Sequence, residues 1–469
     1  MQAFLKHRGV GVTDESARQT VLFPDLSDKP VVATFDEPHS SSDGGAILLR
    51  AIDGQLELTD RLATAVTDAR DAAKVRHELR DLIAQRIYGI ACGYPDANDA
   101  DGLADDPIQK LLLGRDPASG QRLASQPTLS RFENRATARW LFRFAEAFTD
   151  TQIAHQQRRL RGRARRITVD LDVTDDPTHG AQQLTFFNGH YDTWCYLPLL
   201  AFVTFDDERE QHLVAAMLRP GNAGATDGVR GLVKRLLPRL WEAFPGARIR
   251  VRLDGGFASP LLFDLLEAAT VEYVIAMGEN PVLKREAAPY LEQIREAATT
   301  AHETTKMYGE CRYRTRSWPH ERRVIIKAEI VCLAGREPQD NPRFVVTNLK
   351  QTPQWIYEQV YCARGEIENR IKELHDGLQI DRTSCCRFWP NQLRVLLTAA
   401  AYVLLQELRR RAAQTAYARA QVTTLRERLF KLGARLVVSA RRVVLHLPAA
   451  CPSMRAWQAI AIACGASPG

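Results

Sequence analysis

The sequence lacks long apolar runs. No stretch of its 469 residues approaches the roughly 18 apolar residues that a membrane-spanning helix needs. The first residues, MQAFLKHRGVGVTDES, contain no apolar core of a secretory signal. We therefore expect a soluble intracellular protein with no membrane partner.

The sequence also lacks cysteine motifs. Its nine cysteines are scattered, with no CxxC pair and no Cys/His spacing of a zinc site. Cys385 and Cys386 are the only close pair, and vicinal disulfides are strained, so we expect free thiols in a reducing compartment. A zinc or thiol enzyme is disfavoured.

The charge is not strongly of one sign. Lys and Arg number 63 against 56 Asp and Glu, which gives a net charge of +7. The distribution is more informative, because six arginines lie within HQQRRLRGRARR. They are Arg158, Arg159, Arg161, Arg163, Arg165 and Arg166. Such a run is either a solvated segment or a contact to a phosphate backbone, which arginine binds bidentately.

The pattern of apolar residues predicts several regions. Residues 1–45 resemble an arm with little core, and residues 46–154 have helical periodicity. Residues 155–278 contain short apolar strands mixed with helices, with a mostly sequential antiparallel start. Residues 279–344 contain further strands, residues 345–411 long helices, and residues 412–469 a basic tail. This order predicts an α/β fold.

Three acids lie on three separate predicted elements. Asp172 lies in the strand-like RITVDLDVT, Asp254 follows the strand-like RIRVRL before two glycines, and Glu368 lies in a helical pattern. Two carboxylates at the ends of neighbouring strands and a third on a packed helix can converge. Their repulsion is removed by two divalent cations, the arrangement that catalyses phosphoryl transfer. The alternatives are turn chemistry at Asp254 and a solvated face at Glu368.

The segment YCARGEIE carries a resemblance to a known family. Tyr361, Arg364 and Glu368 match the Y-(2)-R-(3)-E-(6)-K signature of one group of bacterial DDE-type insertion-sequence transposases. Further stretches resemble the 1380-type insertion-sequence family within that group. They include YGIACGYPDANDADGLADDP, QPTLSRFENR, LDVTDDPTHGAQQLTFFNGHYDTWCYLPLL, RLDGGFASP, RFVVTNL and DRTSCCRFWPNQLR. The likeness covers roughly residues 20–445.

The resemblance implies an RNase H-like catalytic core, interrupted by a β-rich insertion at residues 279–344. It implies that Asp172, Asp254 and Glu368 are catalytic and bind two Mg²⁺ ions, with Mn²⁺ as a substitute. Asp170 lies two residues earlier on the same strand face and is the substitute for Asp172.

The resemblance also implies residues that bind DNA. Tyr361 and Arg364 match the signature directly, but its lysine position is occupied by His375. Lys372, one helical turn after Glu368, is an alternative cation on the same face. Trp318 is expected either to stack on an extruded base or to be buried on a sheet face. Trp389 is expected in the core.

The function implied is transposition. The enzyme would bind terminal inverted repeats through residues 46–154 and the basic tail, cut the element ends, and join 3′-hydroxyls to target DNA. The resemblance therefore implies that the partner is double-stranded DNA and that the protein forms a homodimer on it. The expected location is the bacterial cytoplasm, in association with the nucleoid. The rivals are an RNase H-like structure-specific nuclease and a catalytically silent DNA-binding relic.

Overall fold

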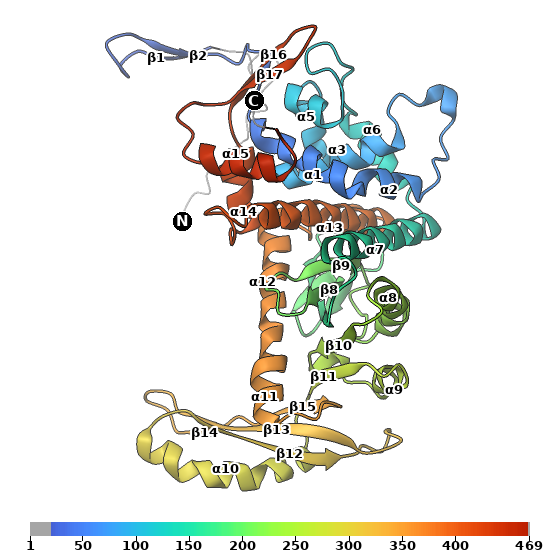
Figure 1. Ribbon diagram of the computed structural model, residues 1–469, viewed down its shortest axis with the longest axis vertical. Coiled ribbons are helices and arrows are strands. Elements are labelled where there is room, and N and C mark those ends of the chain that lie inside the picture. Colours follow the sequence, from blue (N-terminus) through green and yellow to red (C-terminus); the bar gives the residue numbers. More distant parts are fainter. Residues whose placement is uncertain (1–19, 468–469) are drawn as a thin grey trace, which may run out of the picture.

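A nine-stranded mixed sheet forms the centre of the protein (Figure 1). The computed structural model describes residues 20–467. The strand order is β12-β13-β15-β11-β10-β4-β8-β9, and β14 pairs with β13. The strands are β4 (Arg166–Val173), β8 (Leu199–Phe205), β9 (His212–Met217), β10 (Arg248–Leu253), β11 (Glu272–Met277), β12 (Thr305–Tyr313), β13 (Arg322–Val331), β14 (Gln339–Asp340) and β15 (Arg343–Thr347). The predicted α/β class is confirmed.

The middle of the sheet has two kinds of connection. β4, β8 and β9 are sequential antiparallel neighbours, whereas β4, β10 and β11 are parallel. The parallel strands are linked by two helices, α8 (Val229–Ala243) and α9 (Pro260–Ala268). Parallel neighbours end at the same edge of the sheet, so the residues after β4 and β10 are brought together.

The two faces of the central strands differ in polarity. Ile167, Val169 and Leu171 of β4 pack into the hydrophobic cluster that includes α8 and α9. Because side chains alternate along a strand, Asp170 and Asp172 point to the opposite face. Both are nevertheless buried. The polar face is therefore covered by another element.

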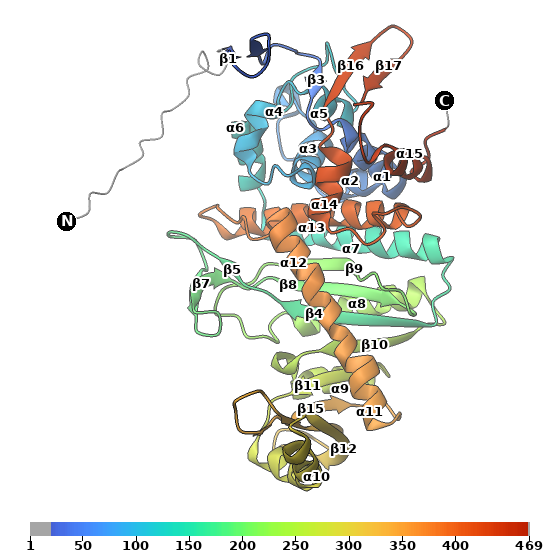
Figure 2. The ribbon, with the colours of Figure 1, turned by 90° about the vertical axis from the view of Figure 1, so that its left-hand side faces the viewer.

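That element is a long, irregular helix spanning residues 353–377, which crosses the sheet (Figures 1 and 2). It consists of α11 (Pro353–Trp355), a π-helical turn η6 (Ile356–Tyr361), a 3₁₀ turn η7 (Cys362–Gly365), α12 (Glu366–Lys372) and a second π-helical turn η8 (Glu373–Gly377). The buried side chains of Ile356 and Val360 anchor its start on β11, β13 and β15. π-helical turns within helices are frequent at functional sites.

Residues 279–344 extend the same sheet, because β13 and β11 both pair with β15. This segment also contains α10 (Pro281–Ala301), which its strand-like texture did not indicate. Leu283, Ala287, Leu291 and Ile294 recur at helical spacing and are buried. The apolar stripe of α10 packs on the sheet end formed by β12 and β13 (Figure 1).

The N-terminal helices stack on one edge of the sheet. α13 (Phe388–Arg411) is almost entirely buried between them and β9, and it shares their hydrophobic core. The helices are α1 (Ile47–Leu56), α2 (Leu58–Thr64), α3 (Leu79–Cys92), α4 (Ala100–Leu103), α5 (Pro107–Leu112), α6 (Gln126–Asn134) and α7 (Ala138–Leu160). α7 and α13 both pack on β9 (Figure 1).

The segment before α1 packs against the C-terminal region. The strand β3 (Ser40–Ser41) pairs with β16 (Ala434–Val438), which pairs with β17 (Val443–His446). A Cβ atom on Gly45 would lie 1.7 Å from the Leu429 carbonyl oxygen, so glycine is required there. The remaining elements are β1 (Val21–Phe23), β2 (Val31–Ala33), α14 (Val422–Leu425), α15 (Met454–Ala463) and a small sheet of β5 (Asp176–Pro177), β7 (Thr193–Tyr196) and β6 (Phe186–Asn188).

This packing limits the expected arm. Residues 21–39 are exposed, but Gly44, Gly45 and Ala46 are buried, and residues 1–19 of the predicted arm lie outside the described residues. All nine cysteines are free, including Cys385 and Cys386 as predicted. Within residues 20–467, no helix has the length and apolar character needed to cross a membrane.

Candidate active site

The site lies at the carboxyl end of β4 and β10. Asp170 and Arg252 are partners in the parallel register of these strands. Asp172 and Asp254 each lie two residues further on, so the same register carries both acids to one sheet edge. The long helix covers that polar face and contributes Arg364 and Glu368.

The two aspartates are held in the same way. One oxygen of Asp172 accepts a hydrogen bond from the Val173 backbone N–H at 2.9 Å, and one oxygen of Asp254 accepts from Gly256 N–H at 2.9 Å. The second contact is the expected turn chemistry before two glycines. In each case the other oxygen remains for a cation.

Arg364 supplies that cation. Its Nη2 lies 2.8 Å from Asp172 Oδ2 and 3.3 Å from Asp254 Oδ2, so one nitrogen contacts both acids. The predicted alternative, an intrahelical pair with Glu368, is not among its contacts. The Arg364 Nε is buried without a hydrogen-bond partner among the described residues. The guanidinium thus offsets the repulsion between the two carboxylates.

Burial makes Asp172 an unusual acid. Desolvation raises the pKa of Asp172 to about 6, opposed by the charge of Arg364 and reinforced by Asp254 and Glu368. Glu368 itself is exposed on α12, one turn after Arg364. Of the three predicted acids, Asp172 and Asp254 are joined through Arg364, whereas Glu368 influences Asp172 through its charge from α12.

Asp172 and Asp254 offer the oxygen donors that a divalent cation prefers. Carboxylate oxygens suit Mg²⁺ and Mn²⁺, and the Asp172 and Asp254 oxygens are already close enough to share one positively charged atom. Within residues 20–467, no three His, Cys, Asp or Glu side chains are grouped closely enough to hold an ion as they stand. The chemistry of these donors suits a divalent cation, and Arg364 contacts the same two oxygens.

Asp170 has a different environment. It is fully buried and forms two bonds with Arg252, at 2.7 Å to Nε and 2.8 Å to Nη2. Gln211 donates a further hydrogen bond at 3.1 Å. Arg252 Nη1 also donates to the Val360 carbonyl at 2.8 Å, in the first π-helical turn. Asp170 thereby fastens the long helix to the sheet, and its oxygens are occupied.

The other signature residues lie along the same helix. The Tyr361 ring packs 5.4 Å from the Tyr357 ring, and burial raises the pKa of its hydroxyl. Lys372 is exposed and forms no ion pair within residues 20–467. His375 lies 2.9 Å from the Thr174 hydroxyl and 3.6 Å from Asp381. His375 thus ties the helix end to the segment after Asp172.

The arginine run lies away from these acids. It occupies the end of α7 and the start of β4, six residues before Asp172, which is about 20 Å along a strand. Arg159 pairs with Glu208 at 2.7 Å, and Arg166 pairs with Asp207 at 2.9 Å. Arg165 lies 3.8 Å from Asp206 and from Asp207. Arg158, Arg161 and Arg163 are exposed without an ion pair in the described chain.

Two tryptophan predictions require correction. Trp318 is 4% exposed and packs against Phe263 and Tyr313, with Arg322 over its ring, so it is not available to stack on a base. The other expected environment of Trp318, a buried position on a sheet face, is the one observed. Trp389 was expected in the core but is 38% exposed, because Phe388 takes the buried position beside it.

Sequence reasoning missed Tyr191. Its hydroxyl lies 3.5 Å from the Val173 carbonyl, and burial raises its pKa to about 12, with contributions from Asp175, Asp172 and Asp254. Tyr191 follows β6 in a connecting turn, and an aromatic residue in a turn carries no spacing signal. Only the folded arrangement places it beside the acids.

A sequence model of the family described as Transposase DDE domain group 1 matches residues 23–463. The chain belongs to this DDE transposase family. The match runs from β1 into α15, so it includes β4, β10 and the long helix. No curated protein matches the chain. Among solved structures, it is similar to a piggyBac transposase synaptic complex with hairpin DNA, at 12% identity and a TM-score of 0.41, over 77% of this chain and 74% of that chain.

Proposed function

We propose that this member of the DDE transposase family binds the terminal inverted repeats of a bacterial insertion sequence and cuts and joins DNA at its ends. The observation that carries the proposal is the sharing of one Arg364 nitrogen by Asp172 and Asp254, at the ends of adjacent parallel strands. An assembly of carboxylates that needs a cation, in a chain of this family, supports metal-dependent phosphoryl transfer.

Asp172, Asp254 and Glu368 would hold the divalent cations, Mg²⁺ or Mn²⁺, and two ions per site are proposed. When bound, such ions activate an attacking oxygen and stabilise the leaving oxygen of an in-line displacement. The backbone bonds to Asp172 and Asp254 orient their remaining oxygens. Arg364, displaced from the acids, would grip a DNA phosphate, and its unpartnered Nε offers a second donor for that contact.

We also propose that the protein has an RNase H-like catalytic core and is similar to the 1380-type insertion-sequence family. The strand order β9-β8-β4-β10-β11, with an antiparallel start and two parallel additions, supports an RNase H-like core. The YCARGEIE segment on the long helix supports the group with the Y-(2)-R-(3)-E-(6)-K signature, and the further stretches that resemble the 1380-type family support that family within it. His375 already contacts Thr174 and Asp381. We therefore assign the DNA contact of the signature lysine to Lys372.

Substrate and assembly are proposed together. Residues 46–154 and the tail would bind the repeats, and a homodimer on DNA would pair two ends. In the tail, Arg426 and Lys431 are engaged with Gly377 and Asp43, whereas Arg428, Arg441 and Arg442 are exposed. The exposed residues are the ones left for DNA. The bacterial cytoplasm, at the nucleoid, is the proposed location.

The test is cleavage of a labelled duplex that ends in the element's own terminal repeat, with Mg²⁺ or Mn²⁺. Wild type is expected to nick at the repeat boundary, and Glu368→Gln to bind the duplex without nicking it. Equal nicking by both proteins would remove Glu368 from the mechanism. Binding without nicking by wild type would favour the catalytically silent relic.

A further inference from the structure

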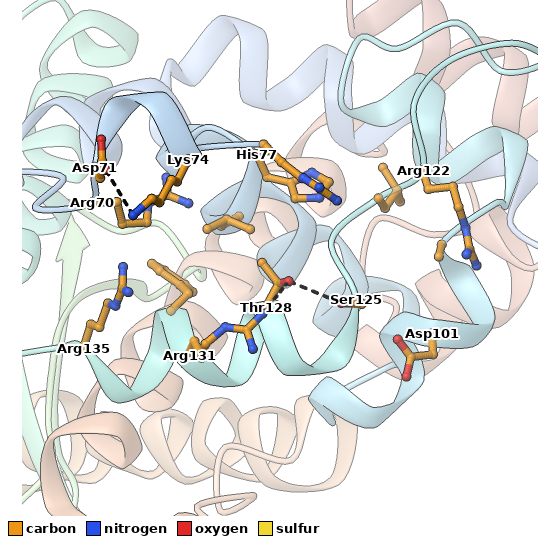
Figure 3. Close-up of a pocket in the computed structure, with 15 residues that line it drawn as sticks. Arg70, Asp71, Lys74, His77, Asp101, Arg122, Ser125, Thr128, Arg131 and Arg135 are labelled. Carbon is orange, nitrogen blue, oxygen red and sulfur yellow. Dashed lines mark hydrogen bonds and ion pairs between the residues drawn. The ribbon is translucent and has the colours of Figure 1, made fainter.

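A basic groove lies in the N-terminal helical region, apart from the acids (Figure 3). One wall is α6, and the other is the segment before α3. The groove has a volume of about 920 Å³. Its six cationic side chains are Arg70, Lys74, Arg76, Arg122, Arg131 and Arg135. Only two carboxylates, Asp71 and Asp101, line it with them.

Local ion pairs do not neutralise this charge. Arg70 pairs with Asp68, Arg122 pairs with Asp105 at 2.8 Å, and Lys74 lies 3.5 Å from Asp71. Three further arginines have no ion pair within residues 20–467; they are Arg76, Arg131 and Arg135. His77 adds no charge near neutral pH, since burial and the neighbouring Arg115 lower its pKa. The groove is therefore a positive surface facing solvent.

The arrangement along α6 favours an extended anion over a small one. Ser125, Thr128, Arg131 and Arg135 recur at helical spacing along one side of the groove, where Figure 3 shows them. From Ser125 to Arg135 a helix advances about 15 Å, the length of roughly four phosphates along one DNA strand. Cations stand on both walls, so such a strand would be gripped from two sides.

The residue types fit the same ligand. Five of the six cations are arginines, whose planar guanidinium binds phosphate bidentately. The Ser125 and Thr128 hydroxyls, 3.2 Å apart, are further donors at the start of α6. In Figure 2, α6 lies on the same side of the molecule as β5 and β7, which follow the carboxyl end of β4.

We infer that this groove holds the phosphate backbone of duplex DNA, as a contact separate from the carboxylate site. The inference rests on the proposed function and deepens it. It assigns to α6 and the segment from Arg70 to His77 a grip that is independent of base sequence. DNA held there would be anchored on the helical layer while a second stretch reaches the acids.

The test compares DNA affinity and its salt dependence by fluorescence anisotropy. The variant is the double substitution Arg131→Gln with Arg135→Gln, at exposed positions where unfolding is not expected. The probes are a duplex with the element's terminal sequence and an unrelated duplex of equal length. The affinity of the variant for both duplexes should fall about tenfold at physiological salt. The slope of log affinity against log salt concentration should decrease in magnitude by about two.

One control removes the same number of charges elsewhere, and a second control keeps the charge in the groove. Lys284→Gln with Arg295→Gln removes two cations from α10 and should leave affinity and slope unchanged. Arg131→Lys with Arg135→Lys keeps the charge and should retain the slope. An unchanged slope in the glutamine variant, or an equal loss in the α10 variant, overturns the inference. So does loss of inorganic phosphate binding alone, with DNA affinity intact.

The outcomes also separate this inference from the proposed function. If wild type binds neither duplex and does not cut, the proposed function fails. If wild type binds and nicks DNA and the glutamine variant does so equally well, only the groove assignment fails.

Discussion

Under the proposed function, Arg364 would link the electrostatics of the acids to the binding of DNA. Its guanidinium lies 2.8 Å from Asp172 and 3.3 Å from Asp254. In the absence of other cations, it relieves the repulsion between these two carboxylates. It also competes with any ion for the same oxygens. Metal and phosphate should therefore bind cooperatively, because a DNA phosphate gives Arg364 another partner as the ion takes the acids.

Arg364→Gln should bind Mn²⁺ more tightly than wild type in the absence of DNA. Loss of the competing cation is expected to lower the dissociation constant by about tenfold, measured by calorimetry. Arg295→Gln on α10, which also loses a carboxylate partner, is the matched control and should leave Mn²⁺ binding unchanged. Weaker Mn²⁺ binding by Arg364→Gln would mean that Arg364 helps to form the ion site.

Asp172 should make stability depend on pH. Its folded-state pKa of about 6 lies above its ordinary value of 3.8, so the folded chain binds the extra proton between these values. Stability is then lost as pH rises through 6. Without divalent ions, Asp172→Asn should be more stable than wild type at pH 8, by on the order of 1–3 kcal/mol, with little difference near pH 4.

Thermal unfolding at the two pH values checks this. Mn²⁺ should stabilise wild type at pH 8 but not Asp172→Asn, and the stabilisation should fade below pH 6, as protons compete for the carboxylate. If Asp172→Asn were less stable than wild type at pH 8 without metal, the account would be contradicted.

Asp170→Asn should unfold more easily than Asp172→Asn. The substitution leaves Arg252 buried opposite a neutral partner, a change that costs about 3–5 kcal/mol. Urea unfolding measures the difference. If Asp170→Asn is as stable as wild type but has lost Mn²⁺ binding, Asp170 takes the role assigned to Asp172.

The acids were accessible to sequence reasoning for a physical reason. Carboxylates at strand ends break the apolar alternation, so Asp172 and Asp254 stand out. Their partners were not accessible. The pairing of Asp170 with Arg252 depends on the register of two parallel strands, and Arg364 reaches the acids across the sheet. Neither relation follows from local spacing.

At the scale of elements, the long helix is the part that positions the site. It is fastened at both ends, through Arg252 to Val360 and through a buried cluster in which Glu373 binds Arg409 and Tyr402 of α13. Between these anchors, the 3₁₀ turn from Cys362 to Gly365 is largely exposed. The segment that carries Arg364 thus has no buried residue between the two anchors.

Hydrogen exchange should reveal this difference. We expect amides of residues 362–368 to exchange faster than those of residues 373–377 in the free protein. Mn²⁺ together with terminal-repeat DNA should slow exchange in the first segment, because the proposed function places both ligands against Arg364 and Glu368. Mass spectrometry of the exchanged protein measures this, and equal protection with and without ligands would contradict it.

Elements were predicted unevenly for identifiable reasons. The strands β4, β8, β9, β10 and β11 were recognisable, since each is a short apolar run between turns. The helix α10 was missed although its apolar residues have helical spacing, because the strand-like residues after it dominated the interpretation of residues 279–344. The continuity of β15 with β11 is a long-range pairing that local patterns do not indicate. Trp389 was misplaced because only its neighbour Phe388 faces the core.

At the scale of the whole molecule, the protein is layered. The helical N-terminal region stacks on α13, the sheet follows, and α10 with β12 and β13 forms the far end (Figure 1). The basic groove belongs to the first layer and the acids to the second. The placement of charge is therefore more informative than the net charge of +7. Arginine and lysine side chains line the groove, and carboxylates lie where the strands end.

The most direct test of the central claim replaces two proposed ligands, Asp172 and Asp254, by cysteine, with Asp170 as the comparison that is not a proposed ligand. It measures nicking of a terminal-repeat duplex in Mg²⁺ and in Mn²⁺. Sulfur is a poor ligand for Mg²⁺, and Mn²⁺ tolerates it better. We predict that Asp172→Cys and Asp254→Cys are inactive in Mg²⁺ and partly active in Mn²⁺, whereas Asp170→Cys is rescued by neither. If Mn²⁺ restores none of the variants, or nicking survives all three substitutions in Mg²⁺, these carboxylates do not hold the catalytic ions.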